Sequence, residues 1–157
     1  MDIIEKFGNM VGNEALKDPV KARRLLLAGY RLQEKKLQLF PDRELPLSGQ
    51  YAARVVMKNI IQALAKPQNS AMMSIFVPGE LLTAAGLTPY SVEALSCFIA
   101  GTKCEQIFLR KTEEEGFPET MCSYHRVFLG AALTGILKCP LLILTCLCLL
   151  KYFIFLL

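Results

Sequence analysis

Residues 71–92 read AMMSIFVPGELLTAAGLTPYSV, and this stretch decides the fold class. Its first part, 71–77, is apolar on both faces apart from one serine, which predicts a buried strand. A helix is expected over 78–82, with Gly86 closing it, and a second strand over 89–92. Strand, helix and strand at this spacing form the unit of a parallel sheet. The sequence therefore predicts an α/β fold with a Rossmann-like sheet and helices on both faces.

The composition excludes several function classes. No Gly-x-Gly-x-x-Gly motif follows the first strand, which disfavours dinucleotide binding of the dehydrogenase kind. The net charge of the 157 residues is only +4, so nothing requires a nucleic-acid partner. The six cysteines show neither paired Cys-x-x-Cys motifs nor zinc-finger spacing. Because no signal peptide precedes them, we expect reduced thiols and a cytoplasmic protein.

A helical region is predicted before the sheet, over 1–69. A short, weak helix over 1–10 is loosened by its glycines. Asp18 is a good N-cap for a long helix over 20–40, whose basic residues are interpreted as a solvated face. A third, amphipathic helix is expected over 51–65. Its apolar stripe consists of Ala52, Val55, Val56, Ile60, Ala63 and Leu64.

The α/β domain, as far as the chain contains it, is expected over 70–138. The segment after the second strand forms its second part. Helices are predicted over 94–101 and 105–111. A short strand over 120–122 is expected to enter the sheet. An apolar, helix-like run follows over 127–137.

The chemically uncommon residues meet at 119–126, ETMCSYHR. Cys122 opens the helical run, so its sulfur is expected at a helix N-terminus. There the partial positive charge and free N–H groups favour a thiolate, the form that binds metal or attacks. His125, the one histidine of the chain, lies one turn further on. The alternative interpretation is that both residues only pack or hydrogen-bond inside the fold.

Several linked motifs resemble the 2-hydroxyacyl-CoA dehydratase / benzoyl-CoA reductase family. They are FVPGELLTAAG at 76–86, PYSVE at 89–93, GFP at 116–118 and CSYHR at 122–126. The similarity runs from about Ser70 to Leu137. It implies an oxygen-sensitive subunit in which cysteines hold a [4Fe-4S] cluster, with Cys122 as the first ligand.

The resemblance also implies a reaction and its partners. Such a subunit belongs to a lyase that removes water from (R)-2-hydroxyacyl-CoA by one-electron ketyl radical chemistry, or to a reductase of aromatic acyl-CoA. The implied partners are an acyl-CoA substrate, a second subunit of the same family and an ATP-dependent activator protein. Ser123 and His125 would surround the cluster or act in catalysis, and Glu80 would be a polar contact to the substrate. Three other residues are expected to be structural: Glu93, Cys97 and Cys104.

The apolar tail, 139–157, has three interpretations. At helical rise it could span a bilayer as a membrane anchor, although Lys151 in its middle costs about 3 kcal/mol on insertion scales. A soluble domain could instead bury one short strand from it. The third interpretation is out-of-frame translation, because the resemblance stops near Lys138, and we expect a truncated, inactive fragment. Two rival functions stay open, a small tail-anchored membrane interaction protein and an electron-carrier or cluster-maturation relative.

Overall fold

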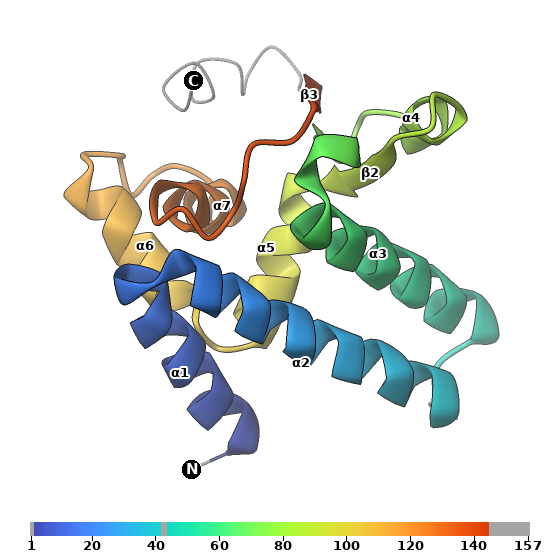
Figure 1. Cartoon of the computed structure of the whole chain (residues 1–157), viewed down its shortest axis with the longest axis horizontal. Coiled ribbons are helices and arrows are strands. Elements are labelled where there is room, and N and C mark those ends of the chain that lie inside the picture. Colours follow the sequence, from blue (N-terminus) through green and yellow to red (C-terminus); the bar gives the residue numbers. More distant parts are fainter. Residues whose placement is uncertain (1, 42–43, 145–157) are drawn as a thin grey trace.

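The computed structural model describes residues 2–41 and 44–144 (Figure 1). The chain is mostly helical, with one small parallel sheet, and three long helices precede that sheet. This arrangement confirms the predicted α/β class with a helical N-terminal region. The long helices are α1 (Ile3–Lys17), α2 (Pro19–Leu39) and α3 (Leu47–Ala65), and a 3-10 turn, η1 (Pro67–Asn69), leads into the sheet.

Helix α1 is longer than the sequence predicted, because it continues through both of its glycines to Lys17. A Cβ on Gly8 would come within 2.0 Å of the Thr102 carbonyl oxygen, and a Cβ on Gly12 within 2.1 Å of Ile107 Cδ1. The glycines therefore let α1 pack closely against residues 102–107. Tertiary packing outweighs their low helix propensity, so the predicted helix is present but its predicted end at residue 10 is wrong.

Helix α2 begins as the sequence predicted. The Asp18 carboxylate accepts a hydrogen bond from the Lys21 backbone N–H at 3.0 Å, and Pro19 occupies the first helical position. Leu26 and Tyr30 point into the core from its buried face. Helix α2 packs on α1 and on α3, which makes it the central member of the N-terminal layer.

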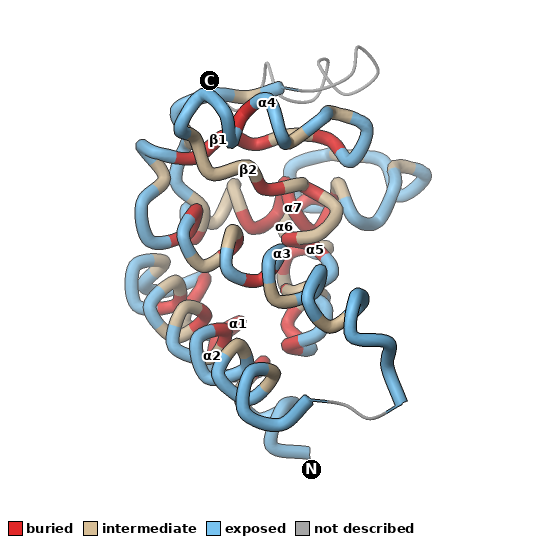
Figure 2. Tube along the Cα trace, turned by 90° about the vertical axis from the view of Figure 1, so that its right-hand side faces the viewer, coloured by how far each residue is buried: buried red, intermediate tan, exposed pale blue. Residues whose placement is uncertain are grey.

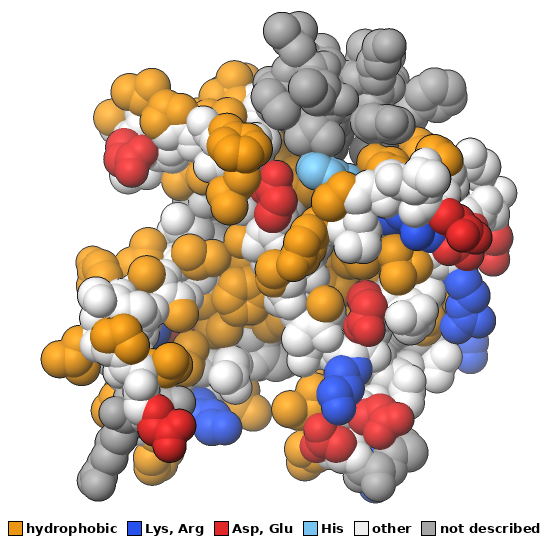
Figure 3. All heavy atoms as spheres, turned by 180° about the vertical axis from the view of Figure 1, so that it is seen from behind, with side chains coloured by type: hydrophobic (Ala, Val, Ile, Leu, Met, Phe, Trp, Pro, Cys, Tyr) orange, Lys and Arg blue, Asp and Glu red, His pale blue; other side chains and the backbone are white. Residues whose placement is uncertain are grey.

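Helix α3 is buried along only the second half of the predicted apolar stripe. Ile60, Ala63 and Leu64 lie in the core, whereas Val55 and Val56 stay 40% and 37% exposed. The helix also starts at Leu47, earlier than predicted. Its first turns extend beyond the sheet, so hydrophobic side chains remain at the molecular surface, as the space-filling view also shows (Figure 3).

The sheet has three parallel strands in the order β2-β1-β3. They are β1 (Ser70–Met73), β2 (Thr88–Ser91) and β3 (Leu142–Leu144), and α4 (Gly79–Ala84) connects the first two. Gly86 adopts a φ of +77° and closes α4 as expected. The predicted strand–helix–strand unit is therefore present.

Strand β1 ends earlier than the prediction of 71–77. The chain turns at Ser74, where the hydroxyl accepts a hydrogen bond from the Phe76 N–H at 3.3 Å and the carbonyl accepts one from Val77 N–H at 3.0 Å. Ile75 and Phe76 consequently become exposed. A run of apolar residues indicated a longer strand, but the Ser74 turn interrupts it.

The third strand comes from an unexpected segment. Residues 120–122 form no strand, because the Met121 N–H donates to the Pro118 carbonyl at 3.1 Å and closes a turn instead. Leu142–Leu144, from the apolar tail, pairs with β1 in its place. The described part of the tail therefore supports the interpretation that the tail contributes one short strand. The other interpretations concern 145–157, which lies outside the described residues.

Three helices complete the fold, namely α5 (Val92–Gly101), α6 (Glu105–Glu114) and α7 (Ser123–Leu133). Helix α7 packs against both α5 and α6. It ends before the predicted Leu137 because Gly135 adopts a φ of +79°. Buried residues follow the inward faces of the helices and the strands (Figure 2). In the described part of the chain, no helix is long and apolar enough to cross a membrane.

Candidate functional site

Cys122 is the N-cap residue of α7, and its side chain is exposed. The Arg126 N–H donates to the Cys122 carbonyl at 3.0 Å and closes the first turn of the helix. No side-chain hydrogen bond caps this helix N-terminus. The predicted placement of a thiol where helical N–H groups are free is therefore observed, although no strand precedes it.

His125 lies beside Glu93, a residue that we expected to be structural. His125 Nε2 is 3.7 Å from Glu93 Oε1, and the two side chains are only 14% and 18% exposed. Within the described residues, neither His125 Nε2 nor Glu93 Oε2 has a hydrogen-bond partner. The packing of α5 on α7 therefore places a carboxylate and an imidazole side by side in a mostly buried position.

Glu93 reaches His125 because β2 ends at Ser91 and α5 starts directly after it. The Ser91 hydroxyl accepts a hydrogen bond from the Ala94 N–H at 2.9 Å and caps the helix, which places Glu93 in its first turn. The signal that could have identified Glu93 is the one used for Glu80, namely an acidic residue just after a strand's carboxyl end. The proximity to His125 itself could not be read from the sequence.

Helix α5 meets α7 at a second point, next to Tyr124. The Ser96 hydroxyl donates to the Tyr124 carbonyl at 2.6 Å. The pKa of the Tyr124 hydroxyl is raised, chiefly by charge repulsion from the Cys97 thiol, with a smaller contribution from Cys122. Cys97, which we expected to be structural, therefore shares the surroundings of Tyr124 with Cys122. Both cysteines are exposed.

The structure does not bring Glu80 to this group. Glu80 is an exposed residue in the first turn of α4, and α4 packs mainly on β2. In the ribbon view α4 lies on the opposite side of the sheet strands from α7 (Figure 1). Ser123, by contrast, is the first residue of α7 and directly follows Cys122.

The described residues do not form a complete metal site. Over 2–41 and 44–144, no three side chains among His, Cys, Asp and Glu are grouped so that they could hold a metal ion. An iron–sulfur cluster is normally held by several cysteine thiolates. Cys122 has the exposure and position of one such ligand, but the remaining ligands are not in the described part, so a complete cluster does not fit there.

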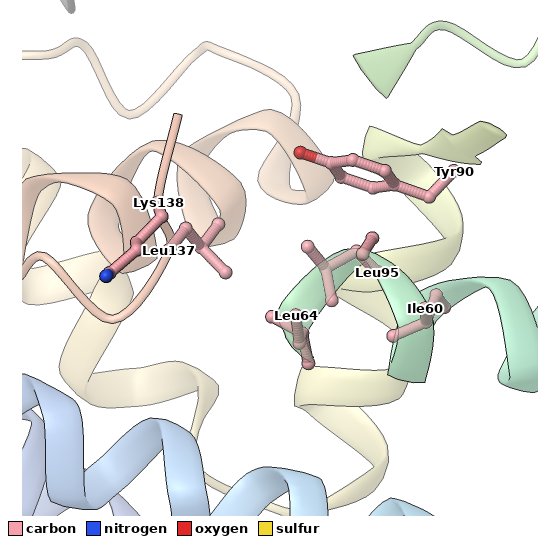
Figure 4. A pocket seen from close by; sticks show the side chains of 7 residues that line it. Ile60, Leu64, Tyr90, Leu95, Leu137 and Lys138 are labelled. Carbon is pink, nitrogen blue, oxygen red and sulfur yellow. The ribbon is translucent and has the colours of Figure 1, made fainter. Parts of the chain in front are cut away.

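A separate, small pocket lies between α3, β2, α5 and the segment after α7 (Figure 4). The ring of Tyr90 lies over Leu95 with its hydroxyl directed toward the α7 side, while the Lys138 amine points away from the pocket. Burial, with a smaller contribution from Cys139, raises the pKa of Tyr90. This pocket could not be predicted from the sequence, because it forms from residues of four separate segments.

Comparison with known proteins assigns the family. No curated protein and no solved structure matches the chain. The family model of the 2-hydroxyglutaryl-CoA dehydratase D-component matches residues 74–155. The match extends beyond Leu137, where the resemblance seen in the sequence ends, and so does not support the out-of-frame interpretation of the tail, which stays a prediction. Because the matched region covers more than half of the chain, including β2, β3 and the Cys122 turn, this chain belongs to the 2-hydroxyglutaryl-CoA dehydratase D-component family.

Proposed function

We propose that this chain contributes one iron ligand, Cys122, to the catalytic centre of a hydro-lyase that acts on 2-hydroxyacyl-CoA. The observation that carries the proposal is the exposed Cys122 thiol at the N-terminus of α7, inside the family-matched region. Cysteine binds iron through its sulfur, and the exposed position of Cys122 leaves that sulfur accessible. The further ligands would come from a second subunit of the same family.

The residues around Cys122 support this assignment. His125 lies on α7 one turn from the thiol, with Glu93 of α5 beside it. Ser123 offers a hydroxyl next to the same helix N-terminus. We leave Glu80 out of the proposed site, since α4 packs away from α7. A cluster, when bound, would supply the one-electron chemistry that dehydration requires, because the β-hydrogen of the substrate is only weakly acidic.

The proposal also concerns the partners. The acyl-CoA substrate, the second subunit and the ATP-dependent activator protein are those that the family implies. Because the described residues lack a complete ligand set, we infer that the chain alone does not dehydrate 2-hydroxyacyl-CoA. The complementary ligands must be supplied before activity appears.

Anaerobic reconstitution with iron and sulfide tests the iron ligand. Iron bound per chain should be below that of a full cluster and should fall further in Cys122→Ser. Cys139→Ser is the matched control, because Cys139 is also exposed but lies outside the proposed site. Equal iron content in the wild type and Cys122→Ser would contradict the proposal. A stable, fully occupied cluster in the chain alone would contradict the inference that ligands are missing.

A further inference from the structure

Arg126 stands out because it is the one charged residue that is buried in the described part of the chain, with 8% of its surface exposed. Burying a guanidinium group is unfavourable unless hydrogen bonds and an opposite charge compensate for the lost water. Its position is one helical turn after Cys122. The contacts that compensate its burial therefore also act on the surroundings of that cysteine.

The Arg126 side chain joins three parts of the fold. Nη2 donates to the Glu113 carboxylate, in the last turn of α6. Nη1 donates to the Glu119 carbonyl at 3.4 Å, in the turn between α6 and α7. Side chains of a helix tilt toward its N-terminus, so a residue in the first turn is well placed to reach back to the preceding turn.

The turn before Cys122 has few other constraints. At its start, the Phe117 N–H donates to the Thr112 carbonyl at 3.0 Å and ends α6. At its end, the Met121 N–H donates to the Pro118 carbonyl. Since no side chain caps α7, the contact between Arg126 and the Glu119 carbonyl ties the middle of this turn to the helices.

We propose that Arg126 is a positioning residue for Cys122. It holds the turn over 117–121 against α6 and α7, and thereby fixes the Cys122 thiol at the first turn of α7. Its importance for iron binding rests on the proposed function. The positioning itself is a property of the metal-free chain and can be tested separately.

Amide hydrogen exchange of the metal-free chain tests this proposal. In Arg126→Met, peptides covering 117–124 should exchange about tenfold faster or more, because a buried charge-assisted contact is lost, while α1 and α2 should change little. Arg110→Met is the matched control, since Arg110 is an exposed arginine on α6, and should leave the exchange of 117–124 unchanged. Lysine keeps the charge but has a single nitrogen. Arg126→Lys should therefore recover most of the thermal stability and little of the local protection.

Two results would overturn the proposal. One is unchanged exchange over 117–124 in a folded Arg126→Met chain. The other is an equal increase in every peptide, which would make Arg126 a residue of general stability only. Should Arg126→Met fail to fold, the same two comparisons made on Arg126→Lys decide the question. Loss of iron binding in Cys122→Ser is measured independently, so a failure of either proposal can be told from a failure of the other.

Discussion

Gly130 of α7 lies directly against the backbone of Phe108 in α6. A Cβ on Gly130 would come within 2.0 Å of the Phe108 carbonyl oxygen, a distance that real Cβ atoms do not tolerate. The two helices can approach this closely only because residue 130 has no side chain. The position of α7, and with it the position of Cys122, depends on this contact.

Gly130→Ala should therefore destabilise the protein. We expect a loss of about 3 kcal/mol in the free energy of unfolding, because backbone atoms must move to admit the methyl group. Urea unfolding followed by circular dichroism measures it. Gly101→Ala is the control, since a Cβ there would meet no described atom within 4 Å. That variant should stay within about 1 kcal/mol of the wild type. Equal stabilities of the two variants would contradict the close packing of α6 and α7.

Cys104 should make the stability depend on pH in the alkaline range. Burial raises the pKa of its thiol from 9.0 to about 11. The folded state therefore holds this proton more tightly than the unfolded state does. The resulting stability is fully present below pH 9 and is lost as the pH rises through about 11.

Between pH 8 and 11 the wild type should lose about 2 kcal/mol more than Cys104→Ala does. Urea unfolding at several pH values compares the two slopes. The cavity left by alanine lowers the stability of the variant at every pH and does not affect the difference in slope. Parallel pH profiles would show that Cys104 does not titrate differently in the two states.

Tyr30 places a hydroxyl in the core without a hydrogen-bond partner among the described residues. Its ring contacts Phe98 edge to face, with the centroids 5.8 Å apart. Tyr30→Phe keeps this ring contact and removes the unpaired group, so it should raise the stability by about 1 kcal/mol. Thermal unfolding measures the change, and Tyr51→Phe, on a side chain that is 70% exposed, should have little effect. A stability loss in Tyr30→Phe would mean that the hydroxyl has a partner after all.

Glu93 and His125 should be energetically coupled. Their side chains are mostly buried and 3.7 Å apart, so a double-mutant cycle with Glu93→Gln and His125→Gln should give a coupling of about 0.5–1 kcal/mol. The cycle is measured by urea unfolding of the four proteins in one buffer. Strictly additive effects would remove the pair from the proposed site.

The predictions from sequence were accurate where a few neighbouring residues decide the local structure. Asp18 and Pro19 start α2, and Gly86 closes α4, because caps and positive φ angles depend on a few neighbouring residues. The predictions failed where distant segments decide the outcome. Gly8 is tolerated inside α1 because the Thr102 carbonyl, far away in sequence, requires its small size.

The candidate site shows the same division. Cys122 was placed at a helix start from the apolar run that follows it, and the structure has it there. Glu93 and Arg126 were not identified, since their partners His125 and Glu119 become neighbours only through the packing of α7 and the turn before it. Sequence spacing contains no information about such contacts.

The sequence by itself determined the α/β class, through its strand–helix–strand unit, and the location of Cys122 at the beginning of a helix. Both follow from backbone preferences that act over a few residues. Only the tertiary structure decided that Leu142–Leu144, and not 120–122, pairs with β1, and which side chains surround Cys122. Strand pairing and helix packing join residues far apart in the chain, and the free energy of those contacts depends on the whole fold.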